Sequence, residues 1–195
     1  MSDSTVPSRA HRSPGQVLGA VLAAGAGTRY GMPKILADDG EWLECAVAAL
    51  RDGGCAEVAV AMGAAVVEPP AGAEALIVED WADGVGASVS AALRWAIARP
   101  AAAGLAVHVV DTPDTGPEVT RRVLDAASGD RGVLARAVFD GRPGHPVYIG
   151  ADHFASALRV IGGDVGAQVY LRSQAVTPVE CGDLSTGEDI DERFR

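Results

Sequence analysis

The feature that most constrains the fold is a short apolar segment that runs directly into a glycine-rich loop. Residues 17–23 (VLGAVLA) contain no polar side chain, which is typical of a strand buried on both faces of a parallel sheet. Gly25, Gly27 and Gly31 follow, and residues 41–51 then carry apolar side chains at helical spacing before a glycine pair. The sequence therefore opens with a strand, a loop and a helix.

The same alternation of strand and helix continues along the chain. The expected elements are strands at 57–62, 75–78 and 105–110 and helices at 88–98 and 117–127. Ser88 is a suitable N-cap for the first of these helices, and Pro117 suits the first turn of the second. Such alternation predicts an α/β fold in which helices cover both faces of a mostly parallel sheet.

The C-terminal third has a different pattern. Residues 133–149 (VLARAVFDGRPGHPVYI) predict two strands around a glycine- and proline-rich turn, which indicates a small antiparallel addition to the sheet. Short helices are expected at 151–160 and 165–173, and a last strand at 175–181. We interpret residues 17–195 as one domain and residues 1–16, rich in serine, proline and charge, as a mobile tail.

Charge and cysteine usage exclude several classes of protein. A formal net charge of −10 argues against nucleic acid and anionic membranes as partners, because both require a basic face. No apolar run has the length of a signal peptide core or a membrane span, so we expect a cytoplasmic protein. Cys45, Cys55 and Cys181 lack the spacing of a zinc site or a disulfide framework, and we interpret them as reduced packing residues.

The glycine-rich loop can be compared with three phosphate-binding designs. A P-loop is excluded, because Lys34 lies between Pro33 and Ile35 and no hydroxyl follows it for magnesium. The dinucleotide fingerprint is matched weakly, because the glycines read GxGxxxG and no acidic residue ends the second strand. In the third design Arg29 and Lys34 clamp a polyphosphate while loop amides bind its oxygens. The alternative is a glycine turn with two solvated cations.

A resemblance extends this interpretation beyond the loop. Residues 22–34 (LAAGAGTRYGMPK) resemble the LAAGxGxRxGxPK loop of nucleotidyltransferases typified by molybdenum cofactor cytidylyltransferase, the MobA-like NTP transferases. Further segments match in family order: 80–93 (DWADGVGASVSAAL), 109–114 (VVDTPD), 142–149 (RPGHPVYI), 163–171 (GDVGAQVYL) and 189–191 (DID). The resemblance implies a three-layer α/β/α sandwich with a Rossmann-like sheet, the nucleotide-diphospho-sugar transferase fold. It also implies transfer of a nucleoside monophosphate to a phosphorylated acceptor, with release of pyrophosphate.

The resemblance also implies roles for individual residues. It assigns nucleotide binding to two loops: Leu22, Ala23, Ala24, Gly25, Gly27 and Thr28 on the first, and Asp83, Gly84, Gly86 and Ser88 on the second. Lys34, expected to be exposed in the cleft, and Arg29 would be the catalytic cations that stabilise charge on the triphosphate. Asp111 would bind Mg²⁺, with Asp189 or Asp191 as a second ligand. Trp81 is interpreted as a packing residue rather than a base-stacking one.

The acceptor is expected near Gly144, His145 and Asp164, where it enters in relatives. His145 is the only ring in that region able to titrate near neutrality, and we expect it to have a structural or acceptor-positioning role rather than to act in acid–base catalysis. Ala24 and Pro33 favour CTP over GTP, since relatives that transfer GMP have LAGG and an acid before the lysine. Molybdopterin is the expected acceptor.

Three departures from the family pattern leave alternatives open. Thr112 replaces the usual Gln, Tyr30 replaces a common Met, and the C-terminal end (DIDERFR) lacks the usual TPED continuation. The alternatives are a GTP-using guanylyltransferase, a transferase for another phosphorylated metabolite, and a nucleotide-sensing or cofactor-carrying protein without turnover. A dinucleotide-dependent oxidoreductase is a more distant alternative.

Overall fold

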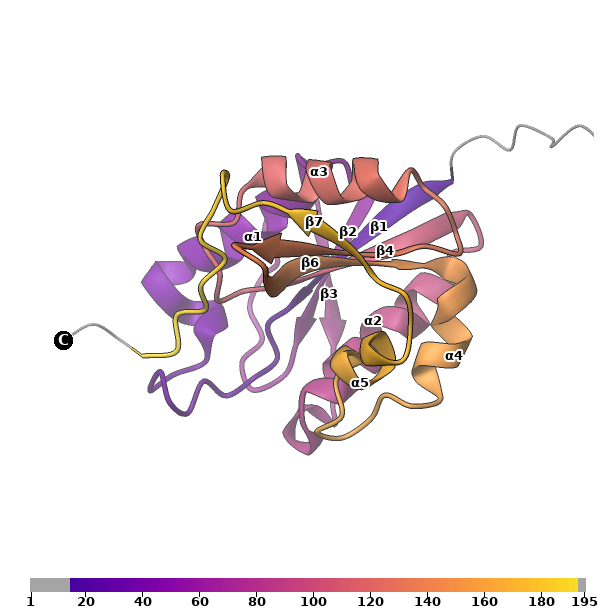
Figure 1. Cartoon of the computed structure of the whole chain (residues 1–195). Coiled ribbons are helices and arrows are strands. Elements are labelled where there is room, and N and C mark those ends of the chain that lie inside the picture. The colour runs from indigo at the N-terminus through magenta and orange to yellow at the C-terminus, as the bar shows by residue number, and fades with distance from the viewer. Residues whose placement is uncertain (1–14, 193–195) are drawn as a thin grey trace, which may run out of the picture.

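The computed structural model describes residues 15–192, so the predicted N-terminal tail lies almost entirely outside the described residues. Its centre is a seven-stranded sheet with the strand order β3-β2-β1-β4-β6-β5-β7 (Figure 1). The strands are β1 (Gln16–Leu22), β2 (Glu57–Met62), β3 (Ala73–Ile77), β4 (Ala102–Val109), β5 (Leu134–Phe139), β6 (Arg142–Gly150) and β7 (Thr177–Glu180). β6 runs antiparallel to β4 and β5, and the other neighbouring pairs are parallel. The predicted mostly parallel sheet with an antiparallel addition is confirmed.

Helices cover both faces of this sheet. α1 (Glu41–Arg51) and α3 (Pro117–Ala127) lie on one face, and α2 (Val85–Ile97), α4 (Phe154–Leu158) and α5 (Ala167–Arg172) lie on the other (Figure 1). Short 3-10 turns, η1 (Lys34–Gly40), η2 (Trp81–Asp83) and η3 (Ala151–His153), lead into α1, α2 and α4. None of the helices between residues 15 and 192 is long and apolar enough to span a membrane.

One expected helix boundary is wrong. The helix predicted over 88–98, with Ser88 as its N-cap, begins three residues before Ser88, at Val85, and Gly84 is its N-cap. Gly84 has a φ of 123°, a conformation that favours glycine and turns the chain from η2 directly into the helix. Ser88 therefore lies inside α2, where its side chain is buried.

Small side chains allow the helices to lie close to the sheet. Gly19 of β1 is an example, because a Cβ atom there would lie 3.1 Å from the Leu50 Cβ atom of α1. Alternate residues of β1 face opposite layers, with Leu18 and Ala20 in the cluster around α2 and Val21 in the cluster around α1. The alanine-rich composition thus builds a thin, closely packed sandwich.

The strand order determines where a ligand can bind. β1 lies between β2 and β4, so the chain leaves β1 toward one side of the sheet and later returns to the other side. Such a switch point opens a crevice at the carboxyl ends of the two strands. The loops after Leu22 and Val109, which include the glycine loop and Asp111, both start there.

Candidate active site

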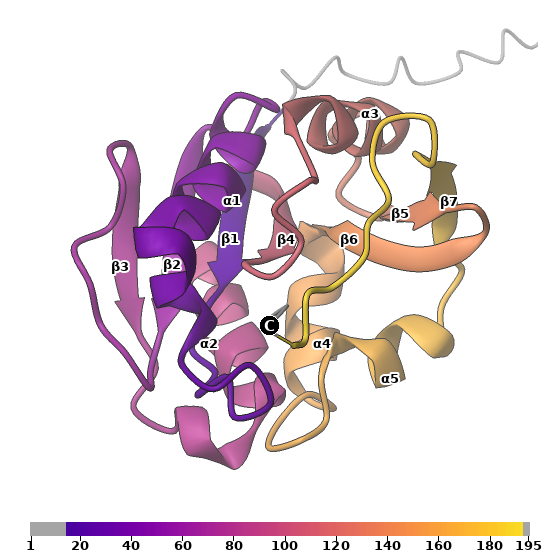
Figure 2. The ribbon, with the colours of Figure 1, turned by 90° about the vertical axis from the view of Figure 1, so that its left-hand side faces the viewer.

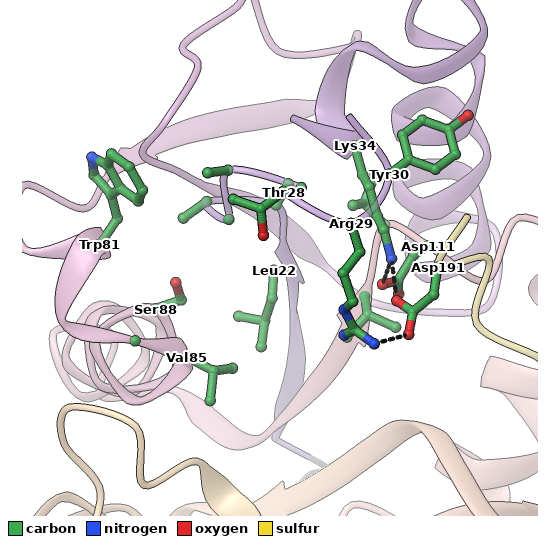
Figure 3. Close-up of a pocket in the computed structure, with 18 of the residues that line it drawn as sticks. Leu22, Thr28, Arg29, Tyr30, Lys34, Trp81, Val85, Ser88, Asp111 and Asp191 are labelled. Atoms are coloured by element: carbon green, nitrogen blue, oxygen red, sulfur yellow. Dashed lines mark hydrogen bonds and ion pairs between the residues drawn. The ribbon is translucent and has the colours of Figure 1, made fainter. Parts of the chain in front are cut away.

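A cavity of about 450 Å³ opens at the carboxyl ends of β1 and β4. Figure 3 shows its two sides, with Trp81, Val85 and Ser88 on one and Lys34, Arg29 and the aspartates on the other. The expected nucleotide-binding residues that line it are Leu22, Ala23, Ala24, Gly25, Gly27, Thr28, Gly84 and Ser88. The two predicted loops therefore form the walls of one cavity.

Two of the expected nucleotide-binding residues, Asp83 and Gly86, are not among the residues that line the cavity. Gly86 faces the turn at 162–165, where its N–H donates to the Gly163 carbonyl oxygen at 2.8 Å. A Cβ atom at Gly86 would lie 2.6 Å from the carbonyl oxygens of Gly163 and Val165. Its lack of a side chain therefore serves contact between α2 and this turn.

A cluster of two cations and two aspartates forms the other side of the cavity. Lys34 Nζ donates to Asp111 Oδ2 at 2.8 Å and to Asp191 Oδ1 at 2.9 Å, and Arg29 Nη1 lies 2.7 Å from Asp191 Oδ2. The Lys34 side chain is only 12% exposed, whereas that of Arg29 is 77% exposed. The expectation that Lys34 would be exposed in the cleft is therefore wrong, because the carboxylates that were predicted as metal ligands also enclose its ammonium group.

The shifted pKa values show how strongly these charges interact. Burial acts to lower the pKa of Lys34, but hydrogen bonds to Asp111 and Asp191 and their negative charges outweigh it, so the pKa is raised. The hydrogen bond from Lys34 lowers the pKa of Asp191 below its ordinary value. Burial, together with the nearby carboxylates of Asp111 and Asp191, raises the pKa of Asp189. Asp191 is thus stabilised as an anion, and Asp189 is not.

The C-terminal segment brings Asp191 to this cluster. Figure 2 shows the segment passing from β7 in front of β6 toward the centre of the molecule. The N–H of Ile190 donates to the Asp111 carbonyl oxygen at 2.9 Å, which fixes the segment beside Asp111. Upstream, the Thr186 N–H and hydroxyl donate to Asp114 Oδ2 at 2.9 and 2.7 Å. The chain end that departs from the family pattern therefore still delivers a carboxylate to the site.

The glycine loop owes its shape to Gly27. This residue has a φ of 61°, and a Cβ atom there would lie 1.9 Å from the Met32 carbonyl oxygen. The Gly27 carbonyl oxygen also accepts a hydrogen bond from the Gly31 N–H at 2.8 Å. Only glycine fits this position, and the resulting turn carries Arg29 and leads to Lys34.

The residues expected to bind the acceptor lie outside the cavity. His145 donates from Nδ1 to the Val107 carbonyl oxygen at 3.3 Å. Burial lowers the pKa of His145 to about 4, so the ring is neutral at pH 7. The expectation that this ring can titrate near neutrality is therefore wrong. Asp164 is exposed on the turn beside Gly84, and the Gly144 carbonyl oxygen accepts from Arg136 Nε at 2.9 Å.

Sequence reasoning missed four residues that line the cavity, Tyr30, Ala82, Val109 and Val110, whereas Ala26 and Val85, which also line it, lie within the two predicted loops. Val109 ends β4 opposite Leu22 and Val110 follows it, so the strand order would have indicated both. Trp81 both lines the cavity and packs across Gly63, where a Cβ atom would lie 2.4 Å from the Trp81 Cβ atom. Its packing role was predicted, and its place in the cavity wall was not.

Metal binding can be judged from the carboxylates. In residues 15–192 no group of three or more His, Cys, Asp or Glu side chains is arranged to hold a metal ion. Asp111 and Asp191 nevertheless direct one oxygen each at the same positive group, the Lys34 ammonium. Mg²⁺ usually takes only one or two protein carboxylates and completes its shell with phosphate oxygens and water. These two residues therefore have the oxygen ligands that a divalent metal ion could use.

Comparison with protein families identifies the chain. The model of the MobA-like NTP transferase domain matches residues 19–178. The chain belongs to the MobA-like NTP transferase family. This confirms the family and the nucleotide-diphospho-sugar transferase-like fold, and it makes the protein a member of a family of nucleotidyltransferases. The match does not extend to a particular nucleotide or acceptor.

Individual relatives add detail. Nicotine blue oxidoreductase of Paenarthrobacter nicotinovorans is 34% identical over 199 residues, which cover 90% of this chain and 92% of that protein. A homologue of Mycobacterium tuberculosis Rv0371c from Mycobacterium sp. strain JC1 has a TM-score of 0.76 and 26% identity, with 90% of each chain covered. Rv0371c of Mycobacterium tuberculosis, solved in complex with manganese, has a TM-score of 0.66 and 26% identity over 85% of this chain and 88% of that one.

Proposed function

We propose that this protein transfers a nucleoside monophosphate from CTP, in preference to GTP, to a phosphate group of molybdopterin. The observation that carries the proposal is the Lys34 ammonium held between Asp111 and Asp191 beside a glycine-loop cavity. In this reaction an acceptor phosphate oxygen bonds to the α-phosphorus of CTP. The bond from that phosphorus to the oxygen that bridges to the β-phosphate breaks, and pyrophosphate leaves with the electron pair.

The two cations suit different tasks in this reaction. The Arg29–Asp191 pair is exposed, and exposed ion pairs contribute only ~0–1 kcal/mol. Arg29 can therefore exchange Asp191 for phosphate oxygens at little cost. Lys34 is fixed by two carboxylates, so its charge is in place before the charge on the phosphoryl oxygens develops. Such preorganised charge is the main contribution that an enzyme makes to phosphoryl transfer.

Magnesium is part of the proposal, and Asp111 and Asp191 would hold it. Asp111, Asp189 and Asp191 carry a formal charge of −3 against +2 from Arg29 and Lys34, which leaves −1 before a triphosphate enters. Bound magnesium would supply charge neutralisation on phosphate oxygens. Asp189 is the weaker candidate ligand, because its surroundings oppose its ionisation. The manganese bound by Rv0371c supports the use of a divalent metal in this family.

The preferences for CTP and molybdopterin rest on residues of the resemblance. Ala24 lines the cavity and Pro33 precedes Lys34, whereas relatives that transfer GMP have glycine and an acid at these places. The segments at 142–149 and 163–171 are those at which the acceptor enters in relatives. A GTP-using enzyme and a transferase for another phosphorylated metabolite are the alternatives within the same reaction class.

Pyrophosphate release tests the proposal. The purified protein is incubated with molybdopterin, magnesium and each of CTP, GTP, ATP and UTP in turn. We expect the fastest release with CTP, and loss of release when EDTA removes the metal. Release with none of the nucleotides contradicts the proposal. If CTP raises the melting temperature but no product forms, the protein is a nucleotide-binding protein without turnover.

The similarity to nicotine blue oxidoreductase favours a second candidate function. In this alternative the same cavity binds a nicotinamide dinucleotide, and the protein reduces an organic acceptor by hydride transfer. The GxGxxxG spacing argues against it, as does the end of β2, which reads Ala61, Met62 and Gly63 without an acid for the ribose. Titration with NADH and NADPH distinguishes the two, since a nucleotidyltransferase consumes neither.

A further inference from the structure

We propose that Arg136 of β5 binds the phosphate monoester group of the acceptor, beside the predicted acceptor residues Gly144 and His145. The inference rests on the proposed function for the identity of the acceptor. Its own basis is the position of this guanidinium group and the neutral partners that hold it.

The strand places Arg136 on the face of the sheet that carries α2 and α5. Its neighbours Ala135 and Ala137 pack in the cluster with α3 on the opposite face. Val147, the residue opposite Arg136 on β6, packs in the cluster that contains α2 and α5. Because side chains alternate along a strand, Arg136 emerges between β5 and α5.

Neutral oxygens hold the guanidinium group there. Arg136 Nε donates to the Gly144 carbonyl oxygen at 2.9 Å, and Nη1 donates to Gln168 Oε1 of α5 at 3.1 Å. Nη2 has no hydrogen-bond partner among residues 15–192. These contacts fix the plane of the group and leave one donor edge available to a ligand.

The charge of Arg136 is not neutralised by the protein. Within residues 15–192 no carboxylate lies within ion-pair distance of it, although the chain carries a net charge of −10. Other arginines without an ion pair, Arg94, Arg121, Arg159 and Arg172, are exposed, whereas Arg136 is half-buried. Burial also lowers the pKa of Arg136, because few surrounding groups stabilise its charge. A half-buried cation of this kind is a binding group for an anion.

Gly144 and His145 connect this position with the segment at which the acceptor is expected. The positive charge of Arg136 and the negative charge of Asp111 both act on the pKa of the His145 ring, in opposite directions. Gly144, the carbonyl partner of Arg136, precedes His145 in the chain. The planar guanidinium offers paired N–H donors, which match two phosphate oxygens.

Binding and kinetics with Arg136→Gln test the inference. The glutamine amide can still donate to the Gly144 carbonyl oxygen, so the hairpin contact is retained while the charge is removed. Phenyl phosphate is titrated into the full chain by calorimetry, and molybdopterin and CTP are varied separately in turnover. We expect a tenfold to hundredfold loss of affinity for phenyl phosphate. The KM for molybdopterin should rise similarly, while the KM for CTP stays within about twofold, since a hydrogen bond to a charged group is worth roughly 1.5–3 kcal/mol.

Two further variants separate binding from a structural role. Arg136→Lys keeps the charge without the paired donors and should lose affinity about threefold to tenfold. Arg94→Gln, which removes an exposed arginine of α2, should match the wild type. Equal affinity of wild type and Arg136→Gln for phenyl phosphate, or no binding by the wild type, overturns the inference.

The outcomes also distinguish this inference from the proposed function. Turnover with an unchanged KM for molybdopterin in Arg136→Gln overturns the inference and leaves the proposed function intact. Absence of turnover in the wild type, combined with phenyl phosphate binding that depends on Arg136, overturns the proposed function and supports the anion site. If circular dichroism shows that Arg136→Gln is unfolded, the affinities of Arg136→Lys and Arg94→Gln for phenyl phosphate are compared instead.

Discussion

The two halves of the candidate site hold their positive charges in opposite ways. In the half around β1 and the glycine loop, Lys34 and Arg29 pair with carboxylates at 2.7–2.9 Å. In the half around β5 and β6, Arg136 is held by a carbonyl and an amide oxygen. The first half positions its cations with the protein's own aspartates. The second leaves a charge for a ligand to neutralise, as the proposed binding of a phosphorylated acceptor by an acidic protein requires.

Lys34→Met should have the largest effect, because it removes the fixed charge from the first half. We expect kcat to fall about a hundredfold to a thousandfold, the range seen when one preorganised donor to a transition state is removed. Pyrophosphate release with CTP measures the loss. Arg51→Met, which removes a cation paired with Asp52 on the surface, is the control. Wild-type turnover by Lys34→Met would show that the cluster is only a surface ion pair.

Comparison of Asp191→Asn with Asp189→Asn should sharpen the assignment of the C-terminal carboxylates. Asp191 contacts both cations. Its loss should therefore reduce kcat/KM about tenfold to hundredfold, because a hydrogen bond to a charged group is worth roughly 1.5–3 kcal/mol. No ion pair of Asp189 is found in residues 15–192, and we expect a change of less than about threefold. Magnesium titrations of turnover provide the measurement. The reverse order of effects would make Asp189 the functional carboxylate.

Gly27→Ala should distort the loop of the first half without touching its charges. A Cβ atom at this position meets the Met32 carbonyl oxygen in a conformation that favours glycine. We expect unfolding free energy to fall by about 1–3 kcal/mol, measured by urea denaturation of the ligand-free protein. Gly25→Ala is the matched control, because nothing lies within 4 Å of its added Cβ atom. Equal stability of the two variants would mean that the loop adjusts to a side chain at residue 27.

His108 lies in β4, the strand that joins the two halves. His108→Leu should have the smallest effect on unfolding free energy at neutral pH. Its ring nitrogens are buried without a hydrogen-bond partner among the described residues. Burial, together with His145, lowers its pKa to about 3 from an ordinary value of 6.5, while Asp114 acts weakly in the opposite direction. The folded protein therefore keeps this ring neutral while the unfolded chain takes up a proton below pH 6.5.

Stability is thus lost as the pH falls from 6.5 toward 3, and this ring accounts for about 2 kcal/mol of the loss at pH 5. Leucine cannot take up the proton, so His108→Leu should lose less unfolding free energy than the wild type between pH 7 and pH 5. Urea denaturation at the two pH values provides the comparison. Parallel losses in both proteins would show that His108 does not carry this pH dependence. His145 is present in both proteins, so its contribution to the loss of unfolding free energy cancels in the comparison.

Much of the first half could be predicted from the sequence, because its signals are local. The apolar run at 17–23 and the three glycines specify a buried strand and a tight turn. Glycine is required at Gly27, because a Cβ atom there would lie 1.9 Å from the Met32 carbonyl oxygen. The order of the β and α segments then places Asp111 at the same edge of the sheet, since parallel strands end together.

The ion pairs could not be predicted, because they join residues far apart in the chain. Lys34 and Asp191 are separated by 157 positions, and no spacing rule indicates that a C-terminal carboxylate reaches the loop lysine. The start of the helix at Val85 was missed for a local reason, since Gly84 and Gly86 suggest a loop. Gly86 is needed instead for contact with Gly163. Arg136 carried no signal at all, because only the sheet alternation and α5 determine its surroundings.

The most direct test of the account is to follow the α-phosphoryl group of CTP. CTP labelled at the α-phosphate is mixed with the protein, magnesium and molybdopterin, and the products are separated. The account predicts that the label joins molybdopterin as CMP, with one pyrophosphate released for each transfer, and that Lys34→Met transfers almost none. Label that remains in CTP, with no transfer from any other labelled nucleoside triphosphate and with NADH consumed instead, would contradict it.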